Sequence, residues 1–138
     1  RETMISVPLT MLLWSSVLMF VLILVPAGAA IHRNGAQAQA GARDNLPEPS
    51  VFMRRANRLN ANMRENMIVF IALIVVAELS GIKDSNIGLG ATIFFYARLV
   101  HAPIYLAGLP AIRPIAWFTS VAGMVMIAIA LFTGPMPA

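Results

Sequence analysis

The stretch RRANRLNANMRENMIVF, from Arg54 to Phe70, decides the fold of this chain. It sets four arginines, one glutamate and four asparagines directly against an apolar run that continues to Ala77. If the stretch is helical, several polar side chains fall within an arc of about 100°. These residues, which we call the polar stripe, are Arg55, Arg58, Asn62, Glu65 and Asn66. Arg64 lies on the opposite side, so the stretch predicts a helix with one polar face.

The composition of the chain indicates that this helix lies in a membrane protein. Of the 138 residues, 59% are hydrophobic and 12% are charged, and the mean hydropathy is +0.77. A soluble domain of this size buries only about two-thirds of its surface, which is too little to hide so many apolar residues. We therefore expect a single integral membrane domain over residues 1–138.

Apolar runs divide the chain into four helical segments. We predict spans at residues 7–31, 51–80, 87–109 and 113–134, because a helix needs roughly 20 residues to cross a bilayer. For the first run, a signal peptide is the competing interpretation, but the run is too long and Glu2 interrupts a basic start. Residues 32–50 are predicted as a loop, with Ser50 as N-cap of the second helix. The expected fold is an all-α membrane four-helix bundle.

The polar stripe must partly lie at membrane depth. In the second segment only Met67–Ala77 is continuously apolar, and at 1.5 Å per residue this run covers about 16 Å, half of a hydrocarbon core. An ionised side chain at that depth costs several kcal/mol unless it is paired or hydrated. The stripe must therefore face a protein interior, a subunit interface or a polar cavity.

The third segment carries a matching polar face. Arg98, His101 and Tyr105 lie within about 60° of one another on a helix, and contact with the polar stripe would satisfy both faces. Arg58 and Glu65 are two turns apart and could bracket a zwitterionic ligand, the arginine on a carboxylate and the glutamate on an amine. Spacing alone leaves open whether they instead pair with each other and hold the bundle together.

Charge and cysteine usage limit the possible partners. An even number of spans puts both chain ends on one side, and the positive-inside rule makes the arginine-rich side cytoplasmic. That side holds Arg33, Arg43, Arg54, Arg55 and Arg113. Because the basic residues gather at one end, we expect no nucleic-acid partner. The absence of cysteine excludes disulfides, protein thiolate catalysis and cysteine-based metal sites, and we expect no metal.

Two motifs resemble the MAPEG family, the membrane-associated proteins in eicosanoid and glutathione metabolism. The first is Arg55-x-x-Arg58-x-x-x-Asn62-x-x-Glu65-Asn66. The second is ARLVHAPIYLAGLPAIR, from Ala97 to Arg113. The sequence departs from the family pattern at Leu59, where alanine is usual, and in the spacing from Tyr105 to Arg113. The resemblance covers nearly the whole chain.

The resemblance implies a homotrimer that binds glutathione as co-substrate between neighbouring subunits, near the cytoplasmic face. It implies glutathione contacts from Arg33, Arg58, Asn62, Glu65, His101 and Tyr105. Arg113 would stabilise the glutathione thiolate as the catalytic residue, with Arg55, Asn66 and Arg98 as a supporting polar face. The implied activity is a transferase or peroxidase in a bacterial inner membrane, acting on hydrophobic electrophiles or lipid hydroperoxides.

Two other functions remain open at this point. A non-catalytic trimeric scaffold, lipid-binding protein or accessory subunit of a larger membrane complex would use the polar stripe to hold subunits together. A proton or ion pathway through His101 and Glu65 is less favoured, because the first and fourth segments offer few polar residues.

Overall fold

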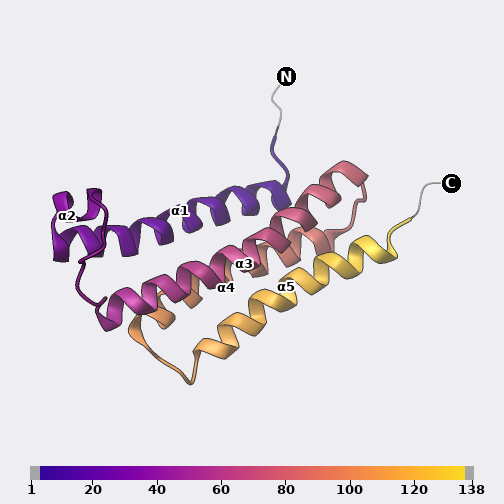
Figure 1. Cartoon of the computed structure of the whole chain (residues 1–138). Helices are drawn as coiled ribbons and strands as arrows, with labels where there is room; N and C mark the ends of the chain where they lie inside the picture. The colour runs from indigo at the N-terminus through magenta and orange to yellow at the C-terminus, as the bar shows by residue number, and fades with distance from the viewer. Residues whose placement is uncertain (1–3, 136–138) are drawn as a thin grey trace.

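The computed structural model describes residues 4–135, which form a bundle of helices (Figure 1). The helices are α1 (Val7–Asn34), α2 (Ala36–Ala40), α3 (Val51–Ser80), α4 (Ser85–Ala107) and α5 (Arg113–Thr133). Figure 1 shows α3 between α1 and α5, with α4 behind it. Since α2 is short, four main helices make the fold, and the all-α four-helix prediction is confirmed.

Capping residues explain where the helices begin and end. The Ser50 hydroxyl accepts a hydrogen bond from the backbone N–H of Met53 at 3.2 Å, so the predicted N-cap of α3 is confirmed. The side chain of Asp84 caps α4 in the same way. Gly81 and Gly108 follow α3 and α4 with φ angles of 71° and 72°, a left-handed conformation that favours glycine and ends a helix.

The loop predicted over residues 32–50 is partly wrong. Helix α1 continues to Asn34, and α2 occupies part of the remainder, because this stretch is rich in alanine and glutamine, which favour helix. Gly35, at φ 86°, separates the two helices. The third predicted segment also shifts: α4 begins at Ser85, next to its cap, and ends at Ala107, just before Gly108.

Within residues 4–135, three helices are long and apolar enough to cross a membrane, namely α1, α4 and α5. Helix α3 is long enough but is not among these candidate spans, because the polar stripe in its N-terminal half makes it too polar. The protein is therefore an integral membrane protein with three candidate spans, and its most polar long helix lies between two of them (Figure 1).

Close packing joins α4 to its neighbours. Phe70 of α3 and Phe94 of α4 are fully buried, and their rings stack with centroids 4.0 Å apart. Gly90 and Gly123 let the backbones of α4 and α5 approach until a Cβ on either would collide with the other's carbonyl oxygen. Small residues at helix contacts are how membrane helices gain van der Waals packing without a hydrophobic driving force.

A proline in α1 is compensated by an asparagine in α3. Pro26 lies inside α1 and has no backbone N–H, so the carbonyl of Leu22, four residues earlier, cannot accept the usual i+4 hydrogen bond of a helix. The amide of Asn60 donates a hydrogen bond to this carbonyl at 3.2 Å. A polar side chain on α3 thus satisfies a backbone group in the middle of an apolar helix, and it fixes α1 against α3.

We expect Asn60→Leu to lower the free energy of unfolding by about 1–2 kcal/mol, because the Leu22 carbonyl would be left without a partner. The measurement is unfolding in mixed micelles titrated with a denaturing detergent. In a Pro26→Ala background the new backbone N–H at position 26 can donate to the Leu22 carbonyl. Asn60→Leu should then lower the free energy of unfolding much less. Equal costs in both backgrounds would contradict this account of Asn60.

Candidate functional site

The candidate site lies at the arginine-rich end of the bundle, where α3 begins and the chain turns from α4 into α5 (Figure 1). Two cavities adjoin here, of about 190 and 420 Å³. The smaller is lined by Arg55, Arg58, Tyr105, Gly108, Leu109, Pro110 and Arg113. The larger is lined by Asn62, His101, Tyr105, Arg113, Pro114, Trp117 and Phe118. Tyr105 and Arg113 belong to both, so the cavities meet at these two side chains.

The smaller cavity is strongly cationic. Arg55, Arg58 and Arg113 contribute three guanidinium groups, and no carboxylate is among its lining residues. Arg55 also donates a long hydrogen bond of 3.5 Å to the carbonyl of Leu106 at the C-terminal end of α4. Its guanidinium packs on Gly108 so closely that a Cβ there would collide with it. The glycine that ends α4 therefore also makes room for this arginine.

The polar faces of α3 and α4 meet at a buried arginine. Arg98 is 1% exposed, and its Nη2 donates to the side-chain oxygen of Asn62 at 2.8 Å and to the Asn62 carbonyl at 3.2 Å. Its Nη1 lies 3.4 Å from Nδ1 of His101. Arg98 thus orients both Asn62 and His101, whose outer edges border the larger cavity.

Aromatic contacts extend this arrangement to Arg113. The rings of His101 and Tyr105 have centroids 5.5 Å apart, and the Arg113 guanidinium carbon lies 5.2 Å from the Tyr105 ring centroid, within cation–π range. Arg113 is also the first residue of α5, whose N-cap residue Ile112 makes no side-chain cap hydrogen bond. The positive end of the helix dipole therefore adds to the guanidinium charge, and an anion is favoured at this point.

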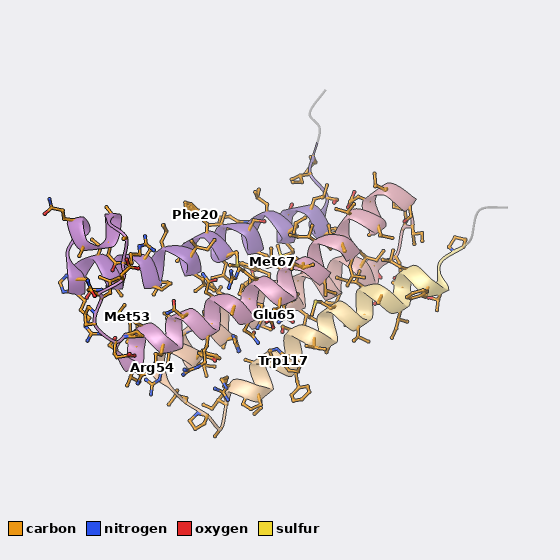
Figure 2. The ribbon with its side chains drawn as sticks, viewed as in Figure 1. Phe20, Met53, Arg54, Glu65, Met67 and Trp117 are labelled. Carbon is orange, nitrogen blue, oxygen red and sulfur yellow. The ribbon has the colours of Figure 1, made fainter. Side chains whose placement is uncertain are left out.

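Some predicted site residues lie outside these cavities within one chain. Arg33 donates to the Glu48 carbonyl at 2.6 Å, at the end of α1, and is not a lining residue. Glu65 is exposed, and Figure 2 shows it on the side of α3 away from α1. Asn66 donates to the Asn62 carbonyl at 2.8 Å. The structure therefore brings together Arg55, Arg58, Asn62, His101, Tyr105 and Arg113 around the cavities.

The aromatic wall of the larger cavity was not predicted from the sequence. Trp117 and Phe118 line it from α5, and Phe118 is 64% exposed on the outside of the bundle. Trp117 lies one helical turn after Arg113, so the i, i+4 spacing was a usable signal. As for metals, residues 4–135 contain no group of three or more histidine, cysteine, aspartate or glutamate side chains that could hold an ion.

The fold and the cavities define the class of protein: an integral membrane helical bundle with a cationic cavity at one end. The chain belongs to the MAPEG family, whose model matches residues 11–133. The fold of this family is a membrane four-helix bundle, and its members typically bind glutathione and form trimers. They are typically glutathione-dependent membrane transferases or peroxidases, or eicosanoid enzymes. Searches of curated proteins and of solved structures gave no match.

Proposed function

We propose that the protein is a glutathione-dependent membrane transferase or peroxidase that acts on hydrophobic electrophiles or lipid hydroperoxides. The observation that carries this proposal is the position of Arg113 at the junction of two unlike cavities. One cavity is suited to a small anionic ligand, and the other opens past aromatic side chains of a candidate membrane span.

The cationic cavity fits the acidic part of glutathione. The tripeptide carries two carboxylates, and a guanidinium can bind a carboxylate through two parallel hydrogen bonds. Arg55 and Arg58 lie one turn apart on α3 and both line this cavity. In our proposal they hold the carboxylates, while Asn62, His101 and Tyr105 contact the peptide where the cavities meet.

Arg113 has the position needed to activate the thiol. A free thiol has a pKa of about 8.5 and is mostly protonated at neutral pH. A nearby guanidinium favours the thiolate, which is the nucleophile. In conjugation, the thiolate sulfur forms a bond to an electrophilic carbon while the leaving group departs with its electron pair. Arg113 stabilises the anionic sulfur up to that point, and the ligand supplies the only thiol, since the chain has no cysteine.

The larger cavity provides the route for a lipid-dissolved co-substrate. Trp117 and Phe118 form its apolar wall, and α5 is a candidate span. A hydrophobic electrophile dissolved in the bilayer would pass Phe118 and reach the junction at Arg113. The same wall limits water near the sulfur, which strengthens electrostatic interactions there.

We also propose that the protein assembles as a homotrimer, with its arginine-rich end in the cytoplasm of a bacterial cell. A ligand with an ammonium group needs a carboxylate, and the lining of neither cavity contains one. Glu65 and Arg33 lie outside the cavities of their own chain, so a neighbouring subunit is the source of such contacts in our proposal. Family members typically form trimers, which supports this arrangement.

Isothermal titration of the detergent-solubilised protein with glutathione tests the binding step. We expect binding by the wild type and a dissociation constant raised by about ten-fold or more in Arg58→Ala, because a charged hydrogen bond contributes roughly 1.5–3 kcal/mol. Arg54→Ala is the matched control: Arg54 is exposed, lines neither cavity and donates a hydrogen bond to the nearby Pro49 carbonyl, so the affinity of this variant should equal that of the wild type. No binding by the wild type would refute the proposal.

A non-catalytic trimeric scaffold or accessory subunit is the second candidate. It is favoured by the exposure of Glu65, which in a single chain borders neither cavity. In this function the polar stripe joins subunits and the cavities bind no thiol. An intact oligomer that fails to bind glutathione in the titration would support the scaffold and exclude the enzyme.

A further inference from the structure

A further cavity lies at the opposite end of the bundle from the candidate site, and we call it the distal cavity. It has a volume of about 650 Å³ and lies where α1 begins, α3 ends and α4 begins. Figure 1 shows these helix ends away from the turn between α4 and α5. The charged side chains of its lining are Glu78, Lys83 and Asp84, and its apolar lining includes Val7, Ile87 and Leu89. The proposed glutathione chemistry uses none of them.

The distal cavity lies at the level of lipid headgroups. Helices α1 and α4 are both candidate spans, and the first residue of each, Val7 and Ser85, lines the cavity. The headgroup layer begins where the hydrocarbon core, and thus the apolar part of a span, ends. A cavity at this level that is lined by both charged and apolar side chains fits an amphiphile, a molecule with a polar head and an apolar tail.

Glu78 presents a carboxylate to the distal cavity in a fixed orientation. The hydroxyl of Ser6 donates a hydrogen bond to Oε1 of Glu78 at 2.6 Å, and it accepts one from the backbone N–H of Leu9 in the first turn of α1. Within residues 4–135, Ser6 is the one hydrogen-bond partner of this half-buried carboxylate. Its second oxygen can therefore accept a hydrogen bond from a ligand, and a charge near the end of a span is costly without such a partner.

The loop between α3 and α4 adds charges of both signs. Asp84 is half-buried and caps α4, since its Oδ1 accepts a hydrogen bond from the backbone N–H of Asn86 at 2.9 Å. Lys83 directly precedes it and is exposed. The distal cavity thus has two carboxylates and one ammonium in its lining, whereas the cationic cavity at the other end has three guanidinium groups and no carboxylate. A headgroup with both a positive and a negative group matches the distal cavity.

We propose that the distal cavity binds an aminophospholipid, a phospholipid whose headgroup ends in a primary ammonium. A primary ammonium has three N–H donors, which the carboxylates of Glu78 and Asp84 accept, while Lys83 provides a positive charge for the phosphate. The headgroup of phosphatidylcholine has no N–H donor, and that of phosphatidylglycerol brings only negative charge to a cavity with two carboxylates. An aminophospholipid matches the charges of both signs.

The outer face of α4 gives the acyl chains a path into the bilayer. Leu89 lines the distal cavity and is 51% exposed, and Tyr96, two turns later on the same face of α4, is 55% exposed. The chains leave the cavity along this face, while the headgroup stays at the helix ends. The lipid therefore belongs to the leaflet opposite the arginine-rich end, and its binding does not depend on glutathione.

Native mass spectrometry of the detergent-solubilised full chain tests the site. The protein is titrated with phosphatidylethanolamine, phosphatidylcholine and phosphatidylglycerol that carry identical acyl chains. We expect phosphatidylethanolamine to bind roughly ten-fold more tightly than the other two, because only its headgroup donates charged hydrogen bonds to the carboxylates. Glu78→Gln should remove most of this preference, since glutamine keeps an acceptor for the Ser6 hydroxyl but carries no negative charge.

Three controls make the result specific. Asp44→Asn removes an exposed carboxylate outside the distal cavity and should keep the preference for phosphatidylethanolamine. Lys83→Gln should weaken the binding of all three lipids by similar factors, because each carries a phosphate. Unfolding of lipid-free Glu78→Gln in mixed micelles should stay close to that of the wild type, which verifies that this variant is folded.

Three results would overturn the proposed lipid site. They are equal affinities of the wild type for phosphatidylethanolamine and phosphatidylcholine, tighter binding of phosphatidylglycerol than of phosphatidylethanolamine, and an unchanged preference in Glu78→Gln. None of these results bears on the glutathione site, which the titration with glutathione decides separately.

Discussion

Replacing Arg113 by alanine is expected to lower glutathione-dependent turnover by about 100-fold, the usual effect of removing one group that stabilises a developing or reacting anion. The residue lies where the cationic cavity meets the aromatic one, and in the proposed function its charge favours the glutathione thiolate. Binding of glutathione should weaken less than turnover falls, because Arg55 and Arg58 remain. The measurement is conjugation of a hydrophobic electrophile by the protein in lipid vesicles.

Two further readouts separate this effect from simple loss of structure. Ultraviolet absorbance of bound glutathione thiolate should disappear in Arg113→Ala, and Arg113→Lys should retain part of it because the positive charge is kept. Arg54→Ala should behave like the wild type in both assays. Turnover within two-fold of the wild type in Arg113→Ala, an effect of roughly 0.4 kcal/mol, would show that Arg113 is not the activating group.

The second large effect is expected from Asn62→Leu, which should lower the free energy of unfolding by about 3 kcal/mol. Asn62 supplies two acceptors, its side-chain oxygen and its carbonyl, to the buried guanidinium of Arg98. Leucine removes the shorter of these bonds, at 2.8 Å, and leaves a buried charge partly unpartnered. Unfolding in mixed micelles with a denaturing detergent measures the loss.

A double-mutant cycle makes this prediction specific. Arg98→Met removes the buried charge, so Asn62→Leu should cost much less in that background, and the two effects should be strongly non-additive. Asn57→Leu makes the same substitution at an exposed position of α3 and should change stability by no more than about 0.5 kcal/mol. Additive effects of Asn62→Leu and Arg98→Met would mean that the contact contributes little.

The helices of this protein were largely predictable because they depend on local patterns. Apolar runs of sufficient length, the Ser50 cap and the i, i+4 recurrence of polar residues in α3 are all properties of neighbouring positions. The prediction was wrong after Ile31, where a mixture of glycine, alanine, glutamine, asparagine and proline indicated a loop, although part of this segment forms the end of α1 and the short helix α2.

The role of Asn60 illustrates what local patterns cannot reveal. Pro26 and Asn60 are both visible in the sequence, but the bond from Asn60 to Leu22 depends on the height at which α1 packs against α3. The periodicity of polar and apolar residues in either helix does not predict how far the two helices are shifted along each other. The same holds for Arg55, whose contact with Gly108 requires α3 and the end of α4 to converge.

By itself, the sequence determined that this chain is a membrane bundle and that α3 carries a polar stripe, because hydropathy and helical spacing depend on residues close together in the chain. Its two motifs resembled the MAPEG family, whose model matches residues 11–133. Only the tertiary structure decided which members of that stripe lie around the same cavities. Helix packing brought Arg55, Arg58 and Asn62 to His101, Tyr105 and Arg113, and it left Glu65 exposed outside both cavities. Residues that share an arc on one helix can face different neighbours, because each neighbouring helix covers only part of that arc.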